Sequence, residues 1–313
     1  MRLKWGRPDL RNYAERFDVP VADGGLGVTF LGVSTLLLDD GESALLTDGF
    51  FTRPGLLEVG LARISPDADR IGACLQRALT QCPRIPTVDA VIPVHSHFDH
   101  ALDSAEVARR TGASLVGGLS TANLGRGGRL PEDQIMVVRP GVAWERGSWS
   151  VTMTESDHCP PDRFPGTIDS PVRPPAKAAA YRCGEAWSIV ARHRDGASVL
   201  VQGSAGYVAG ALDGQQADVA YLGVGQLGLQ SEEYISTYWA ETVGTVGARR
   251  AVLIHWDDFF HPLPMTPKDP PLRALPYAGD DLDVTMAVLT RLADEEGVAL
   301  SLPTVWQRED PWA

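Results

Sequence analysis

The sequence lacks long apolar runs, paired cysteine motifs and basic clusters, and each absence excludes a class of protein. No run of about 18 apolar residues occurs in the 313 residues, so we predict no membrane-spanning helix. The four cysteines show no C-x-x-C spacing, so a disulfide framework is not expected. The formal net charge is −12 and no Lys/Arg-rich segment occurs, which argues against a nucleic-acid partner and leaves small molecules as the expected partners.

The N-terminal segment also lacks the apolar core of a secretory signal peptide, because charged side chains recur throughout residues 1–20. We therefore expect a cytoplasmic protein. Hydrophobic residues make up 44% of the chain, which is sufficient for a substantial core. The length allows one large domain or two small ones, and the sequence does not indicate an oligomeric state.

Potential metal ligands are concentrated in one short stretch, which contains His95, His97, Asp99 and His100. The apolar segment 88–94 before it predicts a buried strand, and a helical pattern begins just after it. The stretch is therefore expected at the C-terminal end of a strand, where α/β proteins usually keep their chemistry. Imidazole is a good ligand for zinc and similar ions, and carboxylate suits the harder ones. His95 and His97 can point the same way from an extended loop, while Asp99 and His100 can face a second ion.

This H-x-H-x-D-H pattern after an apolar strand resembles the signature of the metallo-β-lactamase superfamily, in which three single ligands follow later in the chain. His158 and His255, each at the end of a predicted strand, match two of them in order. The opening hairpin, residues 27–48, is similar to the branch with lactonase-like and N-acylphosphatidylethanolamine phospholipase-D-like members. The resemblance covers about residues 26–302 and implies an α/β (α+β) fold, a four-layer αββα sandwich. We expect residues 1–313 to form a single domain of this kind, with 1–25 as an N-terminal leader packed on the body.

The resemblance also implies which residues hold metal and which assist. The first metal site would consist of His95, His97 and His158, and the second of Asp99, His100 and His255. Asp99 would in addition orient the nucleophile as a catalytic residue. Asp48, at the end of the second strand of the hairpin, would orient a ligand from behind the site.

One position departs from the family pattern. Related proteins read Gly-Asp-Thr-Gly-Tyr where this chain reads Gly203-Ser204-Ala205-Gly206-Tyr207, so Ser204 replaces the aspartate that bridges the two metals. Asp257 and Asp258 are either substitutes for that bridge or loop-capping residues. We expect one or two Zn²⁺ ions per chain, with a weaker second site, and iron or manganese as alternatives.

The leading functional hypothesis is a metal-dependent hydrolase that uses a metal-bound hydroxide on a small ester, lactone or phosphodiester. The alternatives are a non-hydrolytic metal enzyme of the iron oxidoreductase type and a binding protein with a degenerate site. Two proline-rich segments, 159–177 and 262–279, are predicted to border the metal cleft. Phe50, Phe51 and Arg53, close to a strand end, predict either a pocket wall or core.

Overall fold

The computed structural model describes residues 4–313 and contains two sheets of seven strands each, packed face to face. The first sheet has the order β14-β1-β2-β3-β4-β5-β6 and the second β13-β12-β11-β10-β9-β8-β7. The strands of the first sheet are β1 (Gly27–Phe30), β2 (Leu36–Asp39), β3 (Ser43–Thr47), β4 (Thr87–Ile92), β5 (Ser114–Gly117), β6 (Ile135–Val137) and β14 (Arg308–Glu309). Those of the second are β7 (Trp144–Arg146), β8 (Trp149–Ser156), β9 (Ala186–His193), β10 (Ser198–Gln202), β11 (Val219–Gly223), β12 (Arg250–Ile254) and β13 (Ala299–Ser301).

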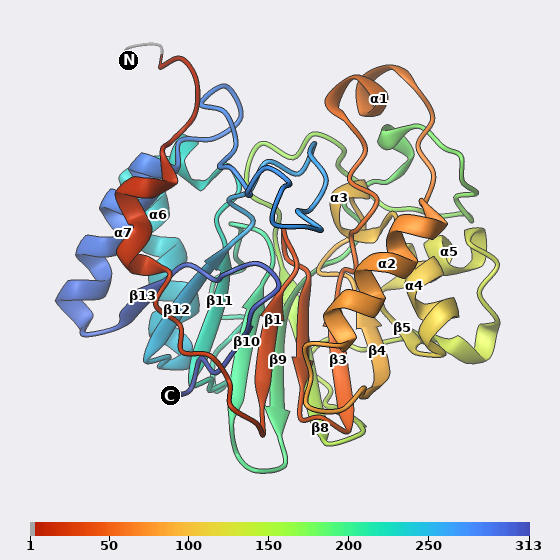
Figure 1. Ribbon diagram of the computed structural model, residues 1–313, viewed down its shortest axis with the longest axis horizontal. Coiled ribbons are helices and arrows are strands. Elements are labelled where there is room, and N and C mark those ends of the chain that lie inside the picture. The colour runs from red at the N-terminus through yellow and green to blue at the C-terminus, as the bar shows by residue number, and fades with distance from the viewer. Residues whose placement is uncertain (1–3) are drawn as a thin grey trace.

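Helices cover the outer faces of both sheets. The helices are α1 (Leu56–Leu61), α2 (Ala68–Leu79), α3 (Phe98–Ala101), α4 (Ser104–Thr111), α5 (Leu119–Gly127), α6 (Glu232–Trp239) and α7 (Leu282–Glu296). Short 3-10 or π segments are η1 (Leu10–Arg16), η2 (Glu132–Gln134), η3 (Ala178–Ala180), η4 (Leu227–Leu229) and η5 (Ala240–Gly244). Figure 1 shows α2, α4 and α5 outside the first sheet and α6 and α7 outside the second. The predicted αββα sandwich is therefore confirmed.

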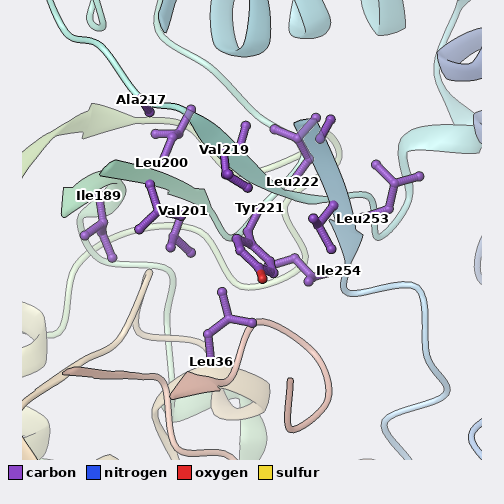
Figure 2. Close-up of a cluster of buried hydrophobic side chains, with 14 of the residues drawn as sticks. Leu36, Ile189, Leu200, Val201, Ala217, Val219, Tyr221, Leu222, Leu253 and Ile254 are labelled. Atoms are coloured by element: carbon purple, nitrogen blue, oxygen red, sulfur yellow. The ribbon is translucent and has the colours of Figure 1, made fainter. Parts of the chain in front are cut away.

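The core between the sheets is built from side chains on their inner faces. Figure 2 shows the ring of Tyr221, from β11, reaching toward Leu36 of β2, while Leu200 of β10 lies on the opposite face of its sheet. Both Tyr221 and Leu36 are at most 1% exposed. Burying one such side chain contributes about 1.5–3 kcal/mol, so this interface is a major part of the stability.

The opening segment differs from its prediction. The β-branched and apolar residues 27–38 predict one continuous strand, but the structure divides them into β1 and β2, which pair antiparallel. Gly32 and Val33 both have positive φ, at 87° and 53°, and the Leu31 N–H donates to the Thr35 carbonyl at 2.9 Å. Two successive left-handed residues cannot continue a strand, so the chain turns there. This turn lies beside the site described below.

The N-terminal segment contacts the body of the protein at several points. The Leu302 N–H donates to the Arg16 carbonyl, and Val21 forms an isolated bridge with Glu309 of β14. The extent of a single domain over residues 1–313 stays a prediction. None of the helices within residues 4–313 has the length and apolarity to cross a membrane. The expected cytoplasmic location also stays a prediction.

Candidate metal centre

The strand directions explain why residues distant in sequence meet at one edge of the sandwich. β3 and β4 are parallel, so Asp48 and His95, which follow them, lie at the same edge. In the second sheet, β8 and β10 both run antiparallel to β9, and β12 runs parallel to them through β11. His158, Ser204 and His255 follow these three strands and therefore lie at one edge too.

The first group of side chains surrounds His95. The Nε2 of His95 lies 3.0 Å from the Nδ1 of His97. The ring of His158 has its centroid 5.0 Å from that of His95 and 4.8 Å from that of His97. Cys183, which the sequence did not suggest, joins this group, because its ligand atom and those of His95 and His97 all lie within 4.8 Å of one another.

Neighbouring oxygens fix which ring nitrogen of two histidines faces this group. The Nε2 of His97 lies 3.2 Å from an oxygen of Asp162 and 3.3 Å from the Phe164 carbonyl. The Nδ1 of His158 lies 2.6 Å from the Cys159 carbonyl. These nitrogens are therefore the N–H donors, which leaves Nδ1 of His97 and Nε2 of His158 with free lone pairs for a metal.

The second group consists of Asp99, His100 and His255, whose ligand atoms also lie within 4.8 Å of one another. The Oδ2 of Asp99 is 3.8 Å from the Nε2 of His100 and 3.6 Å from the Nε2 of His255. Asp48 accepts a hydrogen bond from the Nδ1 of His100 at 2.7 Å, and its other oxygen accepts one from the Val94 N–H. The sequence predicted Asp48 in this neighbourhood.

The Nε2 of His100 provides a direct test of whether a metal fits. Since Nδ1 donates to Asp48, Nε2 carries a lone pair, and it is buried with no hydrogen-bond partner among residues 4–313. A buried acceptor without a partner costs about 1–3 kcal/mol, which a bound cation would offset. Imidazole nitrogens and a carboxylate are also the donor types that divalent transition metals prefer. The residues therefore fit a metal ion.

The electrostatics of the site agree with this fit. Burial, followed by the nearby imidazoles, keeps the pKa of His95 well below its usual value, and burial lowers that of His158 to about 4. Burial alone would raise the pKa of Asp99, but His100 and His255 lower it, and the net shift is downward. Burial lowers the pKa of His100, but Asp48 and Asp99 outweigh it and raise that pKa, so a metal bound there would displace a proton.

The position that lacks the bridging aspartate contributes a neutral group. Ser204 is 7% exposed, and its hydroxyl oxygen accepts a hydrogen bond from the Cys159 N–H at 3.0 Å. The carboxylate of Asp257 pairs with Arg53, and that of Asp258 with Arg7 at 3.0 Å. Both candidate substitutes for the bridge are thus engaged by arginines.

Of the two interpretations of Phe50, Phe51 and Arg53, the core interpretation is correct, since all three are at most 2% exposed. A cavity of about 490 Å³ instead borders the first group of ligands. It is lined by Ser156, Asp157, His158, Pro160, Asp162, Gly166, Cys183, Gly184, Ala186, Tyr207 and Tyr234. Three of these residues belong to the proline-rich segment 159–177. The segment 262–279 contributes none, and its Pro264 carbonyl accepts a hydrogen bond from Trp306.

Comparisons with known proteins agree with this picture, although no family model matches the chain. Over 98 residues, 31% of this chain and 32% of the relative, it is 30% identical to a protein of Heliobacterium modesticaldum named UPF0173 metal-dependent hydrolase. A protein of Anaeromyxobacter sp. (strain K) with the same name is 27% identical over 141 residues, 44% of each chain. The chain thus spans less than half the length of these curated relatives.

A solved structure from Veillonella parvula, described as a possible metal-dependent hydrolase, shares the fold. Its TM-score is 0.53 at 13% sequence identity, over 91% of this chain and 98% of that one. The chain has the αββα fold that its resemblance to the metallo-β-lactamase superfamily implies. Two features of the site depart from the pattern that the resemblance implies, namely the neutral Ser204 and the nearby Cys183.

Cys183 was missed because nothing near it in sequence suggests a ligand. The signal lies in the register of the β8–β9 hairpin, which pairs Ser156 with Ala186. His158 and Cys183 extend these two strands beyond the same end of the ladder and therefore emerge close together. Burial, and then the Asp162 carboxylate, raise the pKa of the Cys183 thiol.

Proposed function

We propose that this chain is a metal-dependent hydrolase, with one metal held by His95, His97 and His158 and a second by Asp99, His100 and His255. The observation that carries the proposal is the convergence of two buried groups of ligand atoms, the first of which borders a cavity of about 490 Å³. The names of the relatives from Heliobacterium and Anaeromyxobacter support the same activity. A divalent metal supplies a Lewis acid that polarises a carbonyl or phosphoryl oxygen and lowers the pKa of a coordinated water.

The donor set favours zinc. Imidazole suits zinc and iron, whereas manganese and magnesium prefer oxygen ligands, and five of the six proposed ligands are imidazoles. With Ser204 at the bridge position, the second ion is held by a single charged ligand, Asp99. We therefore propose zinc at both positions, with lower affinity at the second.

The side chains around the ligands have positioning roles in this proposal. Asp48 holds the ring of His100 by its Nδ1–H, and Asp162 holds that of His97 by its Nε2–H. Such carboxylate–histidine pairs fix the ring and make it a better ligand. Asp99, ionised and buried between two imidazoles, is the group proposed to accept a hydrogen bond from the attacking water and so orient it.

The substrate proposed for this site is a small ester, lactone or phosphodiester. The cavity of about 490 Å³ falls in the size range of small-molecule sites. Nucleic acid is not proposed as a partner, because the formal net charge of −12 opposes binding to a polyanion.

The test is hydrolysis of a chromogenic ester, a lactone and a phosphodiester by the purified protein, together with its metal content. His95→Ala should lose metal and hydrolysis, because it removes a buried ligand. His261→Ala is the matched control, since that side chain is 63% exposed, and it should retain both.

Wild-type metal content and activity in His95→Ala would refute the assignment. Bound iron with a visible absorption band and no hydrolysis would indicate the oxidoreductase alternative. A folded protein that takes up no metal would indicate a binding protein.

A further inference from the structure

The main chain fixes Cys183 beside the metal-binding loop. The Ser96 N–H donates to the Cys183 carbonyl at 2.7 Å, and the Cys183 N–H donates to the Phe164 carbonyl at 2.9 Å. Cys183 is thus tied both to the loop that carries His95 and His97 and to the proline-rich segment 159–177. Its side chain is 6% exposed and lines the cavity.

The sulfur lies within coordination range of the first group. In a tetrahedral zinc site with bonds of about 2.0–2.3 Å, ligand atoms lie roughly 3.5 Å apart. The ligand atoms of Cys183, His95 and His97 all lie within 4.8 Å of one another, so closing to that separation needs a shift of no more than about 1.3 Å. A side-chain rotation supplies a shift of this size.

The charge of the proposed ligand set provides an independent reason for a further anion. Asp99 is its only charged member, because the other five are neutral imidazoles and Ser204 contributes no charge. Two divalent cations would therefore have one negatively charged side chain among their direct ligands, while the carboxylates of Asp48 and Asp162 lie behind the rings of His100 and His97. A thiolate from Cys183 would double the negative charge of the direct ligands.

We propose that Cys183 is a fourth ligand of the metal held by His95, His97 and His158, and that its thiolate supplies the negative charge that Ser204 does not. The open position for water would then belong to the second ion, which has three protein ligands. The inference rests on the metal centre of the proposed function. As the sulfur–metal bond forms, the thiol releases its proton to solvent. A sulfur ligand at this position also strengthens the preference for zinc over manganese and magnesium.

Cys159 offers a matched control, since it is also buried and directly follows His158. Its sulfur contacts the Gln230 side-chain amide at 3.7 Å and the Pro160 carbonyl at 3.8 Å. It belongs to neither group of ligand atoms found within residues 4–313. Replacing Cys159 therefore removes a buried thiol near the site without removing a proposed ligand.

The experiment replaces the bound metal with Co²⁺ in the full-length protein and records absorption spectra. The wild type should show visible ligand-field bands together with a near-ultraviolet sulfur-to-cobalt charge-transfer band. Cys183→Ser should lose the near-ultraviolet band and keep visible bands, whereas Cys159→Ser should keep both. X-ray absorption at the zinc edge of the wild type, which needs no variant, should detect one sulfur at about 2.3 Å.

The outcomes separate this inference from the proposed function. Visible cobalt bands without the near-ultraviolet band in the wild type, or a band that persists in Cys183→Ser, would overturn the Cys183 assignment and leave the metal centre intact. A zinc-edge spectrum with nitrogen and oxygen neighbours alone would do the same. A wild-type protein that binds neither metal would overturn both.

Discussion

The ion pair between Arg53 and Asp257 yields a prediction that separates two roles for Asp257. Both side chains are 0% exposed, and the Asp257 carboxylate also accepts a hydrogen bond from the Val33 N–H at 2.8 Å. Arg53 makes further contacts with the carbonyls of His261 and Asp258, while its Nη1 has no partner among residues 4–313. Loss of the carboxylate would leave a buried guanidinium without its counter-charge.

Removing one partner of a buried pair typically costs about 3–5 kcal/mol. Asp257→Ala should lose about that much of the free energy of unfolding, because it also leaves the Val33 N–H without an acceptor. Asp257→Asn keeps an oxygen for Val33 and should lose less. Asp195→Ala is the surface control: its side chain is 73% exposed, so the change should stay within about 0.5 kcal/mol.

Urea unfolding of the four proteins measures these differences, and elemental analysis of the same samples gives their metal content. The reasoning predicts a lower urea midpoint for both Asp257 variants, with both metals retained in the folded protein. An unchanged midpoint together with loss of one metal would refute it. Asp257 would then be the substitute for the bridging aspartate.

Three further predictions concern single side chains. Asp48→Asn should weaken binding of the second metal about 10–100-fold, because it removes the charge that holds His100. Titration calorimetry measures this affinity, and an unchanged value would contradict the role of Asp48. Ser204→Asp should strengthen binding of that metal by restoring a charged oxygen, and the same titration with no gain would show that Ser204 does not face the metals. Burial raises the pKa of Glu309 from 4.5 to about 8, so the folded state holds its proton more tightly than the unfolded state, and the stability this provides is lost as pH rises through that range. Urea unfolding of Glu309→Gln should therefore show a smaller loss of stability between pH 5 and 9 than that of the wild type. An equal loss in both proteins would show that Glu309 does not have a raised pKa in the folded state.

The predictable parts of the fold are those set by local pattern. The apolar run 88–94 forms β4 and the loop that follows it, and Asp67 caps α2 with its side chain, as the helical spacing after Pro66 indicates. The strands that precede His158 and His255 are also present, because short apolar runs before a polar residue are typical of strands that end at a site.

The incorrect or missing elements depend on tertiary structure. The sequence predicts one strand over residues 178–192, but β9 begins only at Ala186. Cys183 and Gly184 before it instead donate backbone hydrogen bonds to Phe164 and Gly166. The two-residue strand β14 exists only because it pairs with β1, so no local pattern reveals it. The strand is determined by its pairing with β1 and not by a pattern in its own two residues.

The candidate site follows the same division. The H-x-H-x-D-H spacing, together with the resemblance that pointed to His158 and His255, selected the residues that meet at the sandwich edge. Cys183 was not predictable, because its proximity to His95 depends on the register of β8 and β9. The partners of Asp257 and Asp258 were not predictable either, since Arg53 and Arg7 lie more than 200 residues away in the chain.

The central claim is that the two groups of ligand atoms each hold a metal. Elemental analysis of the protein after equilibration with zinc and removal of free metal tests it most directly, with His255→Ala beside the wild type. The account predicts two zinc ions per wild-type chain and one in His255→Ala, since that variant lacks a ligand of the second group only. A wild-type chain without bound metal, or an equal metal count in both proteins, would contradict it.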